Sequence, residues 1–212
     1  MSADAEREIP TNESLALERI VFFSDAVMAI AITLLAIDLR LPDVAGADDR
    51  AFWQLLSDLV PRYFSFAISF AVIAVYWSAH HRIFRYIVRW DGGLLAVNLV
   101  FLFFVVQLPL LNSILGSYGN LSAATAVYAF GLALLGFASA GLWIYAVRRR
   151  LVLDDLTPEF TRFVSLRAVA IPIIFLVSVP LAFISPYLAE LAWLAISVGS
   201  RLVRRPAPPS VA

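Results

Sequence analysis

The chain has 212 residues, of which 61% are hydrophobic, and its mean hydropathy is +0.84. A soluble domain contains about 45–50% apolar residues, and a core of this size could not hide so much apolar surface from water. Sixteen basic and sixteen acidic residues cancel to a net charge of zero, which argues against nucleic acid as a partner, and the absence of cysteine excludes disulfides, thiolate metal sites and cysteine nucleophiles.

The chain begins with a polar, acidic stretch that lacks the basic start and small-residue cleavage site of a signal peptide. We expect residues 1–18 to form a cytoplasmic tail. We also expect the first apolar run to remain in the mature protein.

Six apolar runs follow the tail, and a transmembrane helix needs about 20 such residues. In chain order they are Ile20–Leu39, Tyr63–Ala79, Leu94–Leu115, Leu121–Val147, Ala168–Ile184 and Tyr187–Val203. The sixth run is short and contains Glu190, so it could instead lie in the membrane interface. Residues 52–62 could begin the second helix outside the hydrocarbon. The sequence therefore predicts an all-α integral membrane protein, with six transmembrane helices over residues 19–203 and a disordered cytoplasmic tail over residues 204–212.

The arginines between the runs indicate the orientation. Three loops or ends are basic: those with Arg82, Arg85 and Arg89, with Arg148, Arg149, Arg150 and Arg162, and with the three C-terminal arginines. The opposite loops hold two arginines among four aspartates, or no charge at all. Because cytoplasmic loops carry the excess of basic residues, both termini of this multi-pass cell-membrane protein are expected in the cytoplasm.

A charged residue, Asp25, lies inside the first run, about 9 Å along the helix from Arg19 at about 1.5 Å per residue. A carboxylate inside a membrane costs ~2.5–3.5 kcal/mol on insertion scales, so Asp25 should face protein or water and have a partner. Two interpretations stay open: a polar packing cluster near a helix end, or part of a conduction or relay structure.

Farther along the same run, Ile30, Leu34 and Ile37 follow the i, i+4, i+7 spacing of one helical face, with Thr33 beside them. Aliphatic residues at this spacing line lipid contacts far more often than pores. The spacing alone therefore does not indicate a pore.

A second polar cluster, with Trp77, His80 and His81, ends the second run, and Asn98 follows in the third. Adjacent histidines point about 100° apart on a helix, so they do not form the i, i+4 ligand pair of a zinc site. One histidine could instead hydrogen-bond Asp25 or Asn98, because the cytoplasmic ends of neighbouring helices lie at similar depth. Such a bond would make pH sensitivity possible.

The segment Arg19-x-x-x-Phe23-Ser24-Asp25 closely resembles the R-x-x-x-F-S-D signature in the first helix of the prokaryotic transmembrane protein 175 family of potassium channels. Trp77, His80, His81 and Asn98 resemble that family's second- and third-helix pattern. Six spans with both ends inside also match its single-repeat prokaryotic form.

The resemblance implies a homotetramer in membrane lipid, with a central pore lined by the first helix and permeable to K⁺ and other monovalent cations with modest selectivity. By resemblance, Ile30, Leu34 and Ile37 form a hydrophobic constriction, and Thr33 occupies a position associated with potassium preference. A network that fixes the pore helix on its cytoplasmic side would contain Arg19, Phe23, Ser24, Asp25, Trp77, His80, His81 and Asn98. The resemblance implies no cofactor and no metal other than K⁺ in transit.

Three other functions compete with a channel. A proton-coupled secondary transporter would use Asp25 and His80, but the sequence shows no internal repeat. A membrane-embedded enzyme would use His80, His81 and Asp91, but the motifs of hydrolases, nucleotide-binding proteins and zinc peptidases are absent from the sequence. An assembly protein without transport of its own is the third alternative.

Overall fold

The computed structural model describes residues 12–40 and 48–193, and nearly all of this part is helical. Its long helices are α1 (Asn12–Leu34), α2 (Asp49–Phe84), α3 (Gly92–Val106), α4 (Leu108–Tyr118), α5 (Ser122–Arg148) and α6 (Pro158–Ile184). A 3₁₀ helix, η1 (Leu35–Leu39), continues α1. A further helix occupies residues 186–193, where the described chain ends.

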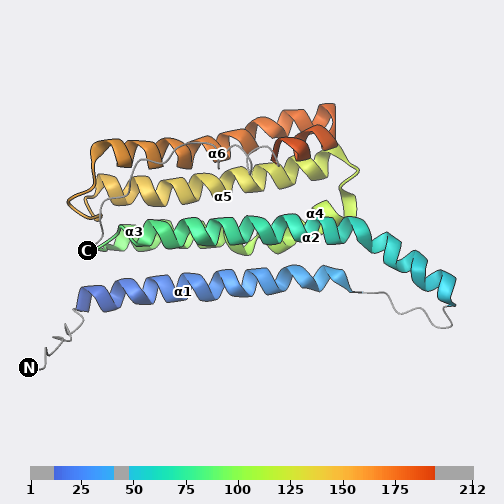
Figure 1. Cartoon of the computed structure of the whole chain (residues 1–212), viewed down its shortest axis with the longest axis horizontal. Coiled ribbons are helices and arrows are strands. Elements are labelled where there is room, and N and C mark those ends of the chain that lie inside the picture. The colour runs from blue at the N-terminus through green and yellow to red at the C-terminus, as the bar shows by residue number, and fades with distance from the viewer. Residues whose placement is uncertain (1–11, 41–47, 194–212) are drawn as a thin grey trace, which may run out of the picture.

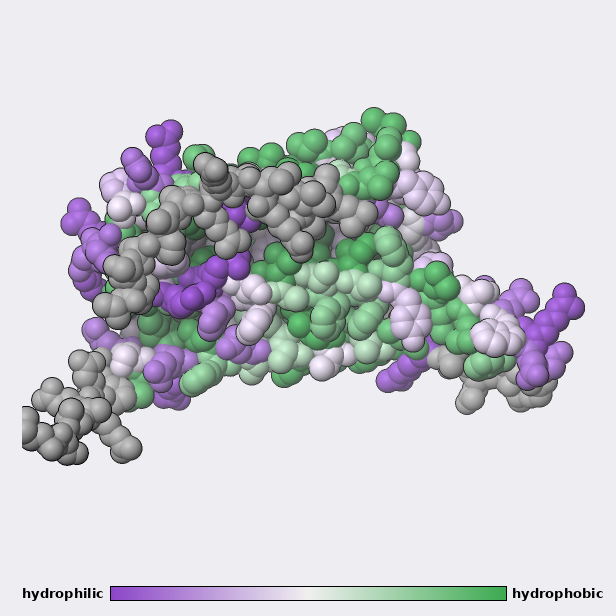
Figure 2. Space-filling model, viewed as in Figure 1, coloured by the Kyte–Doolittle hydropathy of each residue, from purple (hydrophilic) through white to green (hydrophobic). Residues whose placement is uncertain are grey.

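The helices lie side by side along one direction (Figure 1). Helix α1 forms one edge of the bundle and packs on α2 and α3, while α5 packs on α3 and α4 and is covered by α6. Hydrophilic residues gather at the two ends of the molecule, and hydrophobic residues fill most of the surface between them (Figure 2). This distribution fits a bundle that crosses a membrane lengthwise.

Five helical segments of the described chain are long and apolar enough to span a bilayer: Glu13–Ile37, Asp49–Phe84, Gly92–Tyr118, Ser122–Arg148 and Pro158–Ile184. They correspond to the first five predicted spans, so the all-α membrane fold is confirmed. The sixth predicted span, residues 187–203, lies mostly outside the described residues, as does the predicted tail over residues 204–212. Helix α1 begins at Asn12, so the end of the expected cytoplasmic tail is already helical, and the boundary at residue 18 stays a prediction.

The third span is not the continuous helix that the sequence analysis expected. It breaks at Gln107 into α3 and α4, and Pro109 follows in the first turn of α4. Proline has no N–H group, so the carbonyl of Val105 loses its helical partner and the helix restarts. The break lets α4 pack on α2.

Helix α2 is much longer than its predicted apolar run. The side chain of Asp48 accepts a hydrogen bond of 2.8 Å from the backbone N–H of Ala51, and this cap starts the helix well before the predicted span. Its 36 residues extend about 54 Å at about 1.5 Å per residue, whereas the hydrocarbon core is about 30 Å thick. Its N-terminal part projects beyond the other helices in Figure 1, in agreement with the early start considered for residues 52–62.

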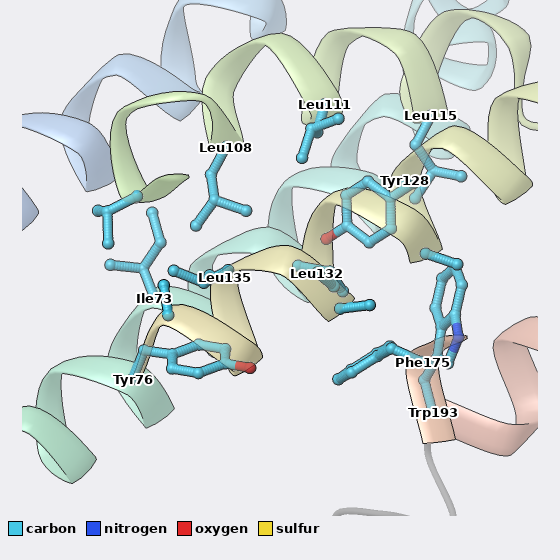
Figure 3. Close-up of a cluster of buried hydrophobic side chains, with 14 of the residues drawn as sticks. Ile73, Tyr76, Leu108, Leu111, Leu115, Tyr128, Leu132, Leu135, Phe175 and Trp193 are labelled. Carbon is cyan, nitrogen blue, oxygen red and sulfur yellow. The ribbon is translucent and has the colours of Figure 1, made fainter. Parts of the chain in front are cut away.

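The main core surrounds α5, where the side chains of Tyr128, Leu132 and Leu135 meet residues from α2, α4 and α6 (Figure 3). Small residues permit this packing. A Cβ atom at Gly136 would lie only 2.7 Å from Pro172 Cβ on α6. Close approach through small residues is the usual basis of helix association in lipid, where burial of apolar surface gives little driving force.

Candidate functional site

Helix α1 presents two different faces. Ile20, Ser24, Met28 and Ala31 are buried, as is Leu35 at the start of η1, and their spacing places them on the face that meets α2 and α3. The opposite face is not covered by the described part of the subunit.

The uncovered face of α1 is mainly apolar. Ile30 is 59% exposed, Leu34 41% and Ile37 47%, and Phe23 lies on the same face at 52%. Helix α1 lies at the edge of the bundle (Figure 1), and the exposure of these side chains shows that the described helices do not cover the stripe. It is therefore available to lipid, to another subunit or to a pore.

The three aliphatic residues are not arranged on a single α-helix, as the i, i+4, i+7 spacing assumed. The 3₁₀ helix η1 starts at Leu35, and its residues turn about 120° each with a rise of about 2.0 Å. Ile37 therefore lies almost directly above Leu34, about 6 Å farther along the axis. The uncovered stripe contains Ile30 and then a stacked pair.

Thr33 belongs to the same face. Its hydroxyl donates a hydrogen bond of 2.8 Å to the carbonyl of Ile30, one turn earlier, and the side chain is exposed. A hydroxyl has one hydrogen and two lone pairs. Because the hydrogen is engaged on the helix, the remaining oxygen lone pairs are available to a cation.

A buried chain of hydrogen bonds holds the other face of α1. His80 Nε2 on α2 lies 2.9 Å from Asn98 Oδ1 on α3, and Asn98 Nδ2 donates to Ser24 Oγ on α1 at 2.9 Å. Ser24 Oγ donates in turn to the carbonyl of Ile20 at 2.8 Å. Ser24 and Asn98 are 0% exposed and His80 is 1% exposed, so water does not compete for these bonds.

The proton positions in this chain follow from counting donors. The single hydroxyl hydrogen of Ser24 goes to Ile20, so Ser24 can only accept from Asn98. The amide oxygen of Asn98 then faces His80, and His80 must carry its hydrogen on Nε2 to donate to it. The chain thus fixes one tautomer of the histidine and one orientation of the amide.

A second contact ties α1 to α2. Trp77 Nε1 donates to Asp25 Oδ1 at 2.9 Å, and the Trp77 ring stacks on His81 with ring centroids 5.9 Å apart. Asp25 is half-buried, and it has the partner that its depth requires.

The structure brings together most, but not all, of the residues expected in the network. His80 bonds Asn98, one of the two partners considered, and not Asp25. Arg19 and Phe23 lie on the exposed side of α1, and within residues 12–40 and 48–193 Arg19 forms no ion pair with Asp25. Their place in the network stays a prediction.

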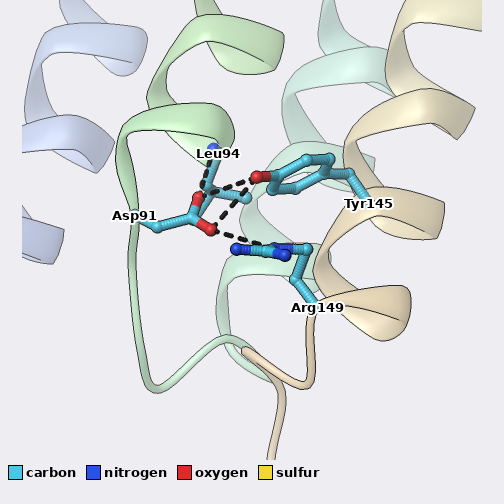
Figure 4. Close-up of polar contacts among 4 residues, drawn as sticks. All are labelled: Asp91, Leu94, Tyr145 and Arg149. Carbon is cyan, nitrogen blue, oxygen red and sulfur yellow. Dashed lines mark hydrogen bonds and ion pairs between the residues drawn. The ribbon is translucent and has the colours of Figure 1, made fainter.

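A polar cluster that the sequence analysis did not find lies at the end of the bundle where α3 begins and α5 ends (Figure 4). Asp91 accepts from the backbone N–H of Leu94 at 2.7 Å, from the Tyr145 hydroxyl at 3.1 and 3.0 Å, and from Arg149 Nε at 3.4 Å. The Leu94 N–H, followed by Tyr145 and Arg149, lowers the pKa of Asp91 below its ordinary value. A Cβ at Gly93 would collide with the Tyr145 hydroxyl, so this glycine admits the contact.

The same end of the bundle is closed by contacts between two loops. Ile87 forms an antiparallel bridge with Val152, and Arg89 donates to Asp154 at 2.6 Å and to the carbonyl of Arg150 at 3.1 Å. These pairs are separated by more than 60 residues of sequence, so no local pattern predicts them. Together with Asp91 they fasten the α2–α3 loop to the α5–α6 loop.

Comparisons with known proteins place these features in context. Residues 19–109, which contain every candidate site residue, match the family model described as endosomal/lysosomal potassium channel TMEM175. The chain is 31% identical to "Potassium channel Cha6605_3372" of Chamaesiphon minutus over 85% of this chain and 88% of that protein. It is 34% identical to "Potassium channel B446_29190" of Streptomyces collinus over 61% of this chain and 64% of that protein.

A similar solved structure is that of a lysosomal potassium-selective channel TMEM175 homologue from Chamaesiphon minutus. It superimposes with a TM-score of 0.78 at 29% identity, over 89% of this chain and 97% of that chain. The likeness therefore extends over nearly the whole bundle and includes the candidate site.

Proposed function

The chain belongs to the TMEM175 family, and from that premise we propose that it is a potassium-permeable cation channel, not an enzyme. We propose further that the channel is a homotetramer in the cell membrane with both termini in the cytoplasm. Four copies of α1 surround the central pore.

The observation that carries this proposal is the division of α1 into two faces. One face is fixed to its own subunit by the Ser24–Asn98–His80 chain and by the Asp25–Trp77 bond. The other face leaves Ile30, Thr33 and Leu34 uncovered by the subunit's own described residues. A single helix cannot enclose a pore, whereas several copies with their uncovered faces inward can.

Ion permeation in this arrangement depends on an apolar neck. Four Ile30 side chains around the axis close the pore by excluding water, and a small outward movement of α1 lets water and an ion pass. The stacked Leu34 and Ile37 extend the apolar stretch, and Thr33 adds an oxygen ligand from each subunit between Ile30 and Leu34. Because few oxygens replace the water that the ion loses, selectivity is modest. The negative charge of Asp25 favours cations at the cytoplasmic entrance.

The proton-coupled transporter is not favoured. The relatives reported above are named potassium channels. Asp25 and His80, which would form its relay, are hydrogen-bonded to Trp77 and Asn98 respectively. Each therefore has a partner other than the second relay group.

A flux assay on purified protein in liposomes tests the proposal. We expect K⁺ to pass faster than Na⁺, and a large organic cation to be excluded, relative to liposomes without protein. Native mass spectrometry in mild detergent should give a tetramer of the 23.4 kDa chain. A monomer under these conditions, or K⁺ flux no greater than in empty liposomes, would contradict the proposal.

A further inference from the structure

A polar cavity opens between α2 and α4, at the end of the bundle opposite the basic loops. Its volume is about 230 Å³, and its walls are Arg62 of α2 with Asn112, Ser113, Gly116 and Ser117 of α4. One water needs only about 10–15 Å³ of such space. The cavity can therefore hold a small polar group together with water.

The walls of the cavity are built by close packing of the two helices. A Cβ atom at Gly116 would lie in ordinary van der Waals contact with α2, 3.4 Å from Arg62 Cα and 3.5 Å from Ser65 Cβ, so the two helices lie close together here. The buried hydroxyl of Ser65 lies 2.9 Å from the carbonyl of Asn112 and 2.8 Å from its Oδ1. These contacts hold α2 and α4 together beside the cavity. The short side chains of Ser113 and Ser117 leave the cavity open.

The charge in the cavity is not neutralised by the described part of the subunit. Within residues 12–40 and 48–193, Arg62 forms no ion pair, and Asp58, one turn earlier on α2, does not reach it. Arg62 is half-buried, and α4 ends at Tyr118, near the boundary of the span. An anion in the cavity would stabilise a guanidinium that is partly withdrawn from water.

We propose that the cavity binds the phosphate group of a membrane lipid. The planar guanidinium of Arg62 can donate two parallel hydrogen bonds to a phosphate, and the hydroxyls of Ser113 and Ser117 supply further donors. Headgroup phosphates lie at the boundary of the hydrocarbon, where the cavity is. Leu110 and Tyr118, which are 58% and 57% exposed on α4, offer apolar surface to the acyl chains. The inference goes beyond ion conduction and does not depend on it.

Native mass spectrometry and thermal unfolding of the full-length protein test the lipid site. The parent, Arg62→Gln and Arg50→Gln are titrated with phosphatidylglycerol in detergent; Arg50 is an exposed arginine at the same end of α2 that does not line the cavity. We expect Arg62→Gln to lower the affinity for lipid about tenfold or more, as for the loss of a charged hydrogen-bonding group. Arg50→Gln should bind as the parent does, and Arg62→Lys, which keeps the charge without the planar fork, should lie between.

Further arms of the experiment separate lipid from other occupants. A phosphate-free glycolipid should not bind to the site, and a Ser113→Ala, Ser117→Ala double variant, which keeps Arg62, should weaken phospholipid binding. Equal lipid binding by the parent and Arg62→Gln would overturn the proposal. So would competition by inorganic phosphate at the affinity of the lipid, which would indicate a free anion. Loss of tetramer stability in Arg62→Gln without any lipid dependence would also overturn it, because a neighbouring subunit would then fill the cavity.

Discussion

Replacing Asn98 with alanine should loosen the proposed pore helix from its own subunit. The amide is the middle of the His80–Asn98–Ser24 chain, so the substitution removes an acceptor from His80 and a donor from Ser24. Both partners are at most 1% exposed, so water does not replace the lost bonds. Ser24 Oγ keeps its bond to the carbonyl of Ile20, so His80 Nε2–H is the group left without a partner. One buried unsatisfied donor gives an expected loss of about 1–3 kcal/mol in the free energy of unfolding. Ser24→Ala leaves only the Asn98 amide unpaired and should cost about 1–3 kcal/mol.

A variant that removes the whole chain distinguishes hydrogen bonding from simple packing. The triple substitution Ser24→Ala, His80→Phe and Asn98→Leu leaves no polar group unsatisfied, so it should be less destabilised than the sum of its single substitutions. Denaturant titrations in mixed micelles measure these free energies, and liposome flux should show lower ion selectivity for Asn98→Ala. A loss below about 0.5 kcal/mol for Asn98→Ala, or a triple variant that loses the full sum, would refute the reasoning.

Three further predictions concern the proposed pore face of α1 and the hydrogen-bonded cluster around Asp91. Ile30→Asn should raise basal K⁺ leak from liposomes about tenfold or more, because a barrier only ~1.4 kcal/mol lower gives a tenfold faster rate. Ile32→Asn, about 200° around the helix, should leave the K⁺ flux near that of the parent. The reverse result would place the pore on the other face of the helix. Thr33→Val keeps the side-chain shape but removes the oxygen, so the K⁺/Na⁺ permeability ratio, measured under bi-ionic conditions, should fall toward one; an unchanged ratio would exclude Thr33 as a ligand. Asp91→Asn should lower the free energy of unfolding at neutral pH by about 1 kcal/mol, because a charged acceptor becomes neutral. The folded-state pKa of Asp91 is depressed, so its charge stabilises the fold above about pH 3.9, and this stabilisation is lost as pH falls through the folded pKa. The free energies of unfolding of the parent and Asp91→Asn should therefore converge in acid. A difference that persists in acid would contradict the electrostatic assignment.

The apolar spans were predictable because run length in the sequence reports directly on the thickness of the bilayer. The contact between His80 and Asn98 could also be predicted, because the end of α2 and the start of α3 lie at the same side of the bundle. The break between α3 and α4 had a signal in Pro109, which the apolar pattern of the run concealed.

Other features had no local signal. Asp91 contacts Tyr145 and Arg149, which lie more than 50 residues away in the sequence, and no pattern in either segment predicts the contact. The 3₁₀ winding of η1 depends on how the end of α1 packs, because Leu35 and Ile37 are ordinary residues of an apolar helix. The roles proposed for the uncovered residues on α1 depend on the proposed assembly of four subunits, for which the sequence of one chain carries no local signal.

At the junction between α1 and η1, a change of helix type alters the rotation of the side chains and the length of the segment together. A 3₁₀ residue turns about 20° more and rises about 0.5 Å more than an α-helical one. Rewinding the three residues from Leu35 to Ile37 into an α-helix would therefore turn the Ile37 side chain by about 60° and draw it about 1.5 Å toward Leu34. In a ring of four such helices, a shortening of about 0.5 Å per residue would therefore be enough to rotate Ile37 relative to the axis and change which side chains face it.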